Sequence, residues 1–128
     1  MGTFSVSMLV GNLEESSFVE VQALADTGSV HSYIPQDVLE GVNVRPTETR
    51  AFAFADERVV DIPFGYAVFV IEGMEVIAPV IFAAEGSSPL LGATTLEAAH
   101  LATDSVNERL TPVVPIGRFG NGNQNSPR

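Results

Sequence analysis

Short apolar runs bounded by turn residues constrain the fold of this chain more than any other feature. Across Phe18–Ala25, Glu20 and Gln22 alternate with apolar residues, which is the two-residue period of a half-buried strand. Two longer apolar runs, at residues 59–71 and 74–83, are separated by a Glu-Gly pair typical of a hairpin turn. The pattern predicts a protein built mostly of β-strands.

Two further extended segments are expected at residues 1–10 and 49–54. Pro63, Gly65 and Pro79 fall inside the long apolar runs. Because proline cannot donate a ladder hydrogen bond and glycine weakens a strand, these residues indicate bulges or edge positions.

Helix is expected at few places. Thr94 followed by Glu97 fits a capping box, in which each side chain bonds the other's backbone amide, so a short helix is predicted over Thr94–His100. Pro35–Gly41 could form one short turn, with proline first and glycine as the stop. The expected fold class is all-β with one short C-terminal helix.

Composition excludes several classes of function. The chain has 128 residues, a formal net charge of −10 and no cysteine. One domain is expected at this length, and the charge argues against nucleic-acid and anionic-membrane partners. Without cysteine there is no disulfide, thiolate nucleophile or cysteine-ligated metal. His31 and His100 lack the spacing of metal ligands, so no metal or cofactor is expected.

Two expectations concern the ends of the chain and its location. No signal peptide is visible, and no apolar stretch reaches the roughly 20 residues of a membrane span, so a cytoplasmic protein is expected. Residues 117–128 are mostly glycine, asparagine and other residues that do not form a core, with Phe119 as the one large apolar side chain. The expected organisation is a folded domain over residues 1–114 and a flexible tail over residues 115–128.

One segment can carry chemistry. The strand Phe18–Ala25 leads directly into Asp26-Thr27-Gly28-Ser29. Taken alone, these four residues are ordinary turn formers, so a simple hairpin turn is one interpretation. Further on, Leu90-Leu91-Gly92 runs straight into the predicted helix. An apolar pair that ends in glycine before a short helix suits a chain that packs closely beneath a loop.

In this order, the segments resemble the retropepsin-like aspartic proteases of retroviruses, retroelements and bacteria. The resemblance rests on Asp26–Ser29 followed by Ser32–Ile34, on Leu90–Gly92, and on a hairpin between the two motifs, and it extends from about residue 5 to residue 114. It implies a closed barrel that works as a homodimer, because the chain holds a single Asp-Thr-Gly and the family's site needs two.

The resemblance implies that Asp26, Thr27 and Gly28 are catalytic, in an endopeptidase without metal or covalent intermediate. As is known for aspartic proteases, two carboxyl groups about 3 Å apart cannot both ionise, so they share a proton and act on water as base and acid. The Thr27 hydroxyl would hold the loop rigid, and Gly28 would let the backbone approach its partner and the substrate.

A peptide or protein substrate is also implied by the resemblance. Residues 51–66 resemble the flap hairpin of the family, with a charged tip where retroviral flaps are rich in glycine. The candidate substrate-binding residues are Ser29, Val30, Ala55, Asp56, Glu57 and Leu90.

Three alternatives stay open at the level of the sequence. The chain could be a non-catalytic dimerisation or peptide-binding module, in which Asp26–Gly28 only makes the loop rigid. It could be a monomeric barrel in which Asp26 caps a turn. It could also be a fragment of a longer polyprotein.

Overall fold

The computed structural model describes residues 3–118, so residues 119–128 of the expected tail lie outside the described residues. Its elements, in chain order, are β1 (Phe4–Gly11), β2 (Phe18–Ala25), β3 (Ser32–Pro35), α1 (Gln36–Gly41), β4 (Glu48–Ala53), β5 (Val59–Ile71), β6 (Met74–Ala83), β7 (Leu90–Leu91), α2 (Ala93–Ala98), β8 (Leu101–Asp104) and β9 (Arg109–Pro112). The all-β fold class is confirmed.

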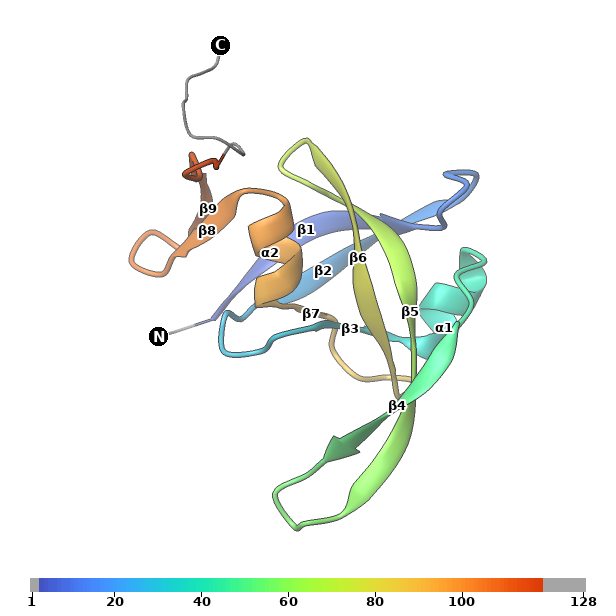
Figure 1. Ribbon diagram of the computed structural model, residues 1–128. Coiled ribbons are helices and arrows are strands. Elements are labelled where there is room, and N and C mark those ends of the chain that lie inside the picture. The colour runs from blue at the N-terminus through green and yellow to red at the C-terminus, as the bar shows by residue number, and fades with distance from the viewer. Residues whose placement is uncertain (1–2, 119–128) are drawn as a thin grey trace.

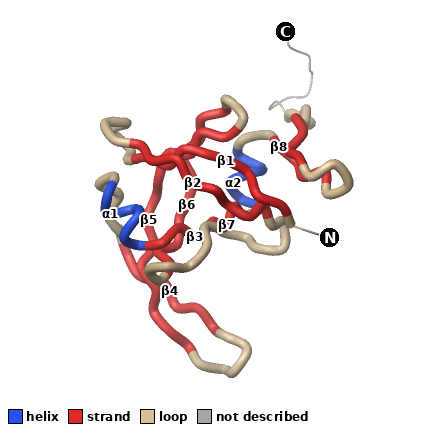
Figure 2. Tube along the Cα trace, turned by 180° about the vertical axis from the view of Figure 1, so that it is seen from behind, coloured by secondary structure: helices blue, strands red, loops and turns tan. Residues whose placement is uncertain are grey.

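Seven of these strands form one sheet in the order β1-β2-β7-β3-β6-β5-β4, and β8 pairs with β9 in a separate two-stranded sheet. Because β1 pairs with β5 as well as with β2, the ladder returns to its first strand (Figure 2). Within the sheet β4 pairs only with β5, and the two form a hairpin that extends away from the rest of the molecule (Figure 1).

The core lies inside this ring of strands. Alternate residues of β5, namely Ala67, Phe69 and Ile71, are fully buried there, as the two-residue period of a strand requires. Leu91 of β7 and Leu96 of α2 join the same cluster. The short strand β7 is therefore held in the core directly before α2 begins.

The prolines in the long strands occupy positions with a strand neighbour on one side. Pro63 pairs with Thr49 of β4, whereas the pairing of β5 with β6 begins one residue later. Pro79 pairs with Tyr66, and the pairing of β6 with β3 begins at Val80. The prediction of edge positions is confirmed, yet both strands run unbroken through their prolines.

Two expectations about helices were wrong. The described residues contain two short helices, because Gln36–Gly41 is helical with Pro35 as its N-cap. The second helix, α2, begins at Ala93, and its N-cap Gly92 offers no side-chain hydrogen bond, so the capping box at Thr94 does not form. Within residues 3–118 neither helix is long and apolar enough to cross a membrane.

Candidate active site

Asp26 stands where β2 ends and a tight turn begins. Its backbone amide donates to the carbonyl of Leu91 at 2.9 Å, which continues the parallel pairing of β2 with β7. The Gly28 amide donates to Oδ1 of Asp26 at 2.9 Å, and the Ser29 amide donates to the Asp26 carbonyl at 3.1 Å. This Asx turn fixes the carboxylate while leaving the side chain partly exposed.

The start of α2 supports the loop from below. The amides of a helix's first turn have no hydrogen-bond partner inside the helix. Here the carbonyl groups of the loop accept these hydrogen bonds. The Ala93 amide donates to the Ser29 carbonyl at 2.8 Å, and the Thr94 amide donates to the Val30 carbonyl at 3.0 Å. These backbone contacts explain why no side chain caps the helix.

Gly92 lets the loop and the helix approach each other closely. A Cβ atom at this position would lie 2.3 Å from the carbonyl oxygen of His31, which is too close for any residue other than glycine. The expectation that the Leu90–Gly92 segment packs beneath a loop agrees with this contact.

Two buried hydroxyl groups that the sequence analysis did not assign complete this support. Oγ of Ser32 lies 2.6 Å from Oγ1 of Thr95 and accepts a hydrogen bond from the Gly92 amide at 3.0 Å. Both residues are fully buried. The signal was present in the sequence, because Thr95 adjoins Leu96 on the apolar side of the predicted helix, where a polar group needs a partner.

A pocket of about 550 Å³ opens beside Asp26. It brings the three catalytic candidates together with two hydroxyl residues of the segment after α2, which the sequence did not single out. Its lining residues are Thr3, Ala25, Asp26, Thr27, Gly28, Thr103 and Ser105. A second pocket, of about 450 Å³ and mainly apolar, is lined by Thr27 together with residues of α2, β8 and the segment after β9.

The substrate-binding candidates near the loop are spread around it. The side chain of Val30 is exposed, and the Ser29 hydroxyl donates to the His31 carbonyl at 2.9 Å. Leu90 is half-buried in β7, between β2 and β3. None of these three lines the pocket that contains Asp26.

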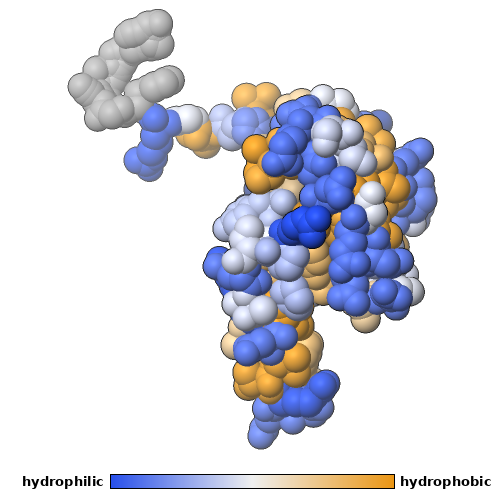
Figure 3. Space-filling model, turned by 90° about the vertical axis from the view of Figure 1, so that its right-hand side faces the viewer, coloured by the Kyte–Doolittle hydropathy of each residue, from blue (hydrophilic) through white to orange (hydrophobic). Residues whose placement is uncertain are grey.

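The other candidates, Ala55, Asp56 and Glu57, form the turn of the β4–β5 hairpin. Asp56 pairs with Arg58 at 3.2 Å, and Glu57 has a φ of 68°, the left-handed conformation that glycine adopts most easily. In the single chain this tip extends away from the body and does not line the Asp26 pocket (Figure 1). The hairpin carries hydrophobic residues behind a hydrophilic tip (Figure 3).

The donor set around the loop does not include a cluster suited to a metal ion. Among the described residues there is no group of three His, Cys, Asp or Glu side chains that could hold one. The pocket beside Asp26 is lined instead by residues that carry hydroxyl groups, and the Gly28 amide donates to the Asp26 carboxylate.

The chain was compared with known proteins. No protein-family model and no curated protein matches the sequence. Among solved structures it is similar to the simian foamy virus (mac) protease, with 18% identity, coverage of 73% of this chain and 91% of that one, and a TM-score of 0.55. It is also similar to the EIAV protease solved with the inhibitor HBY-793, with 12% identity, coverage of 75% and 86%, and a TM-score of 0.57.

A third similar structure is the retroviral protease-like domain of Ddi1 from Leishmania major. The identity is 16%, the match covers 89% of this chain and 97% of that chain, and the TM-score is 0.53. The three matches cover between 73% and 89% of this chain. The chain has a retropepsin-like fold.

Proposed function

We propose that the chain is an aspartic endopeptidase whose site forms when Asp26 residues of two copies meet across a two-fold axis. One observation carries the proposal. The Asp26 carboxylate is held by the Gly28 amide, partly exposed, beside an open pocket, in a fold of the kind found in retroviral proteases.

The chemistry needs a single proton shared between the two carboxyl groups. The ionised carboxylate takes a proton from a water molecule as the water oxygen bonds to the peptide carbonyl carbon. The protonated carboxyl group donates its proton to the carbonyl oxygen. The resulting tetrahedral species then breaks its C–N bond. The carboxyl group that took the water proton donates it to the departing nitrogen, and the other carboxylate takes a proton from one hydroxyl of the tetrahedral species, which leaves a free acid and a free amine and restores the shared proton.

The neighbouring residues act by position. The Gly28 amide orients Asp26, and the exposed Thr27 lies between the two pockets, where the loop of a second copy would meet it. Val30 and Leu90 would contact side chains of an extended peptide. Backbone groups of the Ala55–Glu57 turn would close over that peptide, as flaps do when they exclude water.

The first test replaces the reacting group. Asp26→Asn keeps the shape of the side chain but removes the shared proton, so cleavage of short peptides with apolar residues at their centre should fall by about a hundred- to ten-thousand-fold. The matched control is Asp37→Asn, in the exposed first turn of α1, which should cleave as the parent does.

Both variants are checked for an unchanged fold by circular dichroism. Folded Asp26→Asn that cleaves the same peptides at the parent's rate would contradict the proposal.

A further inference from the structure

The base of the β4–β5 hairpin is defined by one residue. Phe64 is the one residue of β5 that has register partners in both β4 and β6, namely Glu48 and Ile81. Among residues 3–118, no further strand lies beside the hairpin from Pro63 to the tip. Because two-stranded hairpins are only marginally stable by themselves, the side chains at this junction decide how firmly the hairpin is held.

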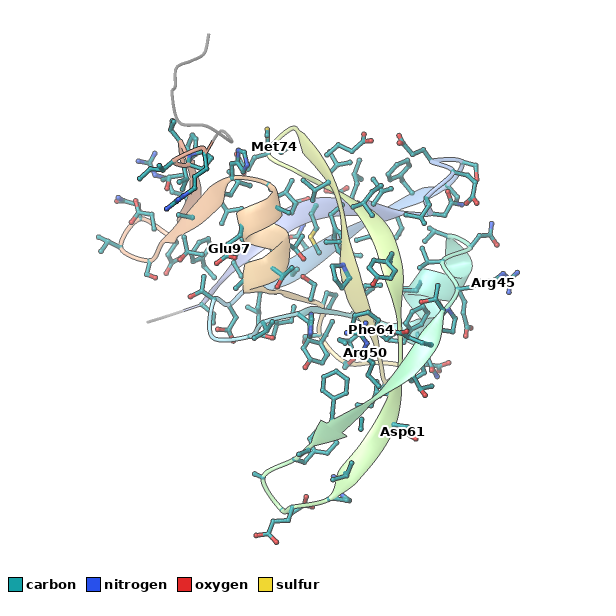
Figure 4. The ribbon with its side chains drawn as sticks, in the orientation of Figure 1. Arg45, Arg50, Asp61, Phe64, Met74 and Glu97 are labelled. Atoms are coloured by element: carbon teal, nitrogen blue, oxygen red, sulfur yellow. The ribbon has the colours of Figure 1, made fainter. Side chains whose placement is uncertain are left out.

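The Phe64 ring is enclosed by side chains from both parts of the molecule. The guanidinium carbon of Arg50, on β4, lies 3.8 Å from the ring centroid (Figure 4). His31 meets the same ring edge-to-face at 5.6 Å between centroids, and Tyr66 does so at 5.8 Å. Phe64 is 1% exposed as a result.

His31 belongs to the Asp26 loop. Its carbonyl accepts the Ser29 hydroxyl hydrogen bond and lies against Gly92, so its backbone is fixed by the same contacts that support the loop. The stack of Arg50, Phe64 and His31 is thus a continuous path of contacts from the hairpin to that loop.

The His31 ring contains an unusual feature. Its Nδ1 is buried and has no hydrogen-bond partner among the described residues. A buried polar atom without a partner destabilises the fold, so packing alone would favour a phenylalanine here. This predicts that His31→Phe keeps the ring contact with Phe64, whereas His31→Ala loses it.

We propose that Arg50, Phe64 and His31 form a joint that sets the position of the β4–β5 hairpin relative to the Asp26 loop. The proposal rests on the proposed function in one respect, namely that this hairpin acts as the flap. The three residues are positioning residues, since they act on the substrate through the hairpin.

The joint is tested first without any activity assay. Hydrogen exchange is measured on the hairpin amides of the parent, Arg50→Gln, His31→Ala and His31→Phe. Arg–aromatic and aromatic-pair contacts of this kind predict exchange about three- to ten-fold faster in Arg50→Gln and His31→Ala. His31→Phe should exchange at the parent's rate.

The matched control lies in the same hairpin. Arg50 pairs with Glu48 at 2.6 Å, and Arg58 likewise pairs with Asp56; Arg58 lies 5.1 Å from the Phe54 ring, but at the tip. Arg58→Gln should leave the amides at the hairpin base unchanged. Equal protection of the base in Arg50→Gln, His31→Ala and the parent would overturn the proposal, as would an equal loss in Arg58→Gln.

Peptide cleavage provides the second readout. If the hairpin is the flap, Arg50→Gln and His31→Ala should raise KM by a similar factor with little change in kcat, and His31→Phe should restore the parent's KM. If Arg50→Gln and His31→Ala exchange their hairpin amides faster than the parent but the parent itself cleaves no peptide, the joint is supported and the proposed function is contradicted. Lower kcat with unchanged KM and unchanged exchange would contradict the joint alone.

Discussion

At the scale of single residues, the site depends on small groups that let the chain pass close to itself. Gly92 touches the His31 carbonyl, and Ser32 links the Gly92 amide to the Thr95 hydroxyl. None of these groups lines the pocket beside Asp26. They fix the loop that carries Asp26, so changes here should alter stability before they alter chemistry.

Gly92→Ala should lower the free energy of unfolding by about 3 kcal/mol, because its methyl group would collide with backbone rather than with a flexible side chain. Gly41→Ala is the matched control, since a Cβ there meets nothing within 4 Å, and it should raise stability by up to about 1 kcal/mol. Urea titration of both variants provides the measurement. Equal midpoints for the two would show that the close approach at Gly92 is not required.

Ser32→Ala should lower the free energy of unfolding by about 2 kcal/mol, because the Gly92 amide and the Thr95 hydroxyl would lose a hydrogen-bond partner inside the core. Ser7→Ala removes a hydroxyl that bonds to Glu20 on the surface and should change stability by less than about 0.5 kcal/mol. Thermal unfolding compares them, and a Ser32→Ala variant as stable as Ser7→Ala would refute the role given to the buried pair.

Sequence reasoning found Asp26 and Gly92 because each belongs to a local motif. It placed the helix cap on Thr94, whereas the partners of the helix amides are carbonyls of a loop far away in the sequence. Nothing in the local pattern indicates that partner. The buried Thr95 could have been noticed, but its contact with Ser32 depends on how β3 meets α2.

At the scale of elements, the alternation of apolar and polar residues predicted β2 well, because this strand buries one face in the core, whereas β4 has no buried residue. The short segments β7 and α1 were harder to predict, since two residues in β7 and six in α1 give little periodicity. The hairpin turn between β5 and β6 formed at the Glu-Gly pair, where Glu72 and Gly73 both have positive φ.

The hairpin turns also bring two acidic side chains together. The Glu15 carboxyl group raises the pKa of Glu75, mainly by a hydrogen bond and then by charge repulsion. Since the pKa is higher in the folded chain than in the unfolded one, the folded state loses stability as the pH rises above about 4.5 and through the raised pKa.

Glu75→Gln should therefore be more stable than the parent at neutral pH, and the difference should vanish in acid, where Glu75 is protonated in both states. Glu72→Gln, in the adjoining turn, is the matched control for the loss of one negative charge. The measurement is the melting temperature of each variant at about five pH values between about pH 3 and about pH 8. A Glu75→Gln advantage that is the same at every pH would contradict the pairing with Glu15.

At the scale of the whole molecule, the order of motifs along the chain predicted the retropepsin-like fold, whereas the arrangement around the site could not be read from it. The sequence does not show that the hairpin leaves the body at Phe64, or that Thr103 and Ser105 line the pocket beside Asp26. Both follow from contacts between distant segments. The meeting of two Asp26 carboxyl groups depends on a second chain and is a proposal.

The absence of cysteine in the chain allows that meeting to be measured directly. In Asp26→Cys, each protomer carries a single thiol at the proposed two-fold axis, and in the control Asp37→Cys the thiol lies on the exposed start of α1. Both are treated with an oxidant or a short thiol-reactive crosslinker and analysed on a denaturing gel. The account predicts a covalent dimer for Asp26→Cys and a monomer for Asp37→Cys; an Asp26→Cys chain that stays monomeric at concentrations where the folded protein is dimeric would contradict it.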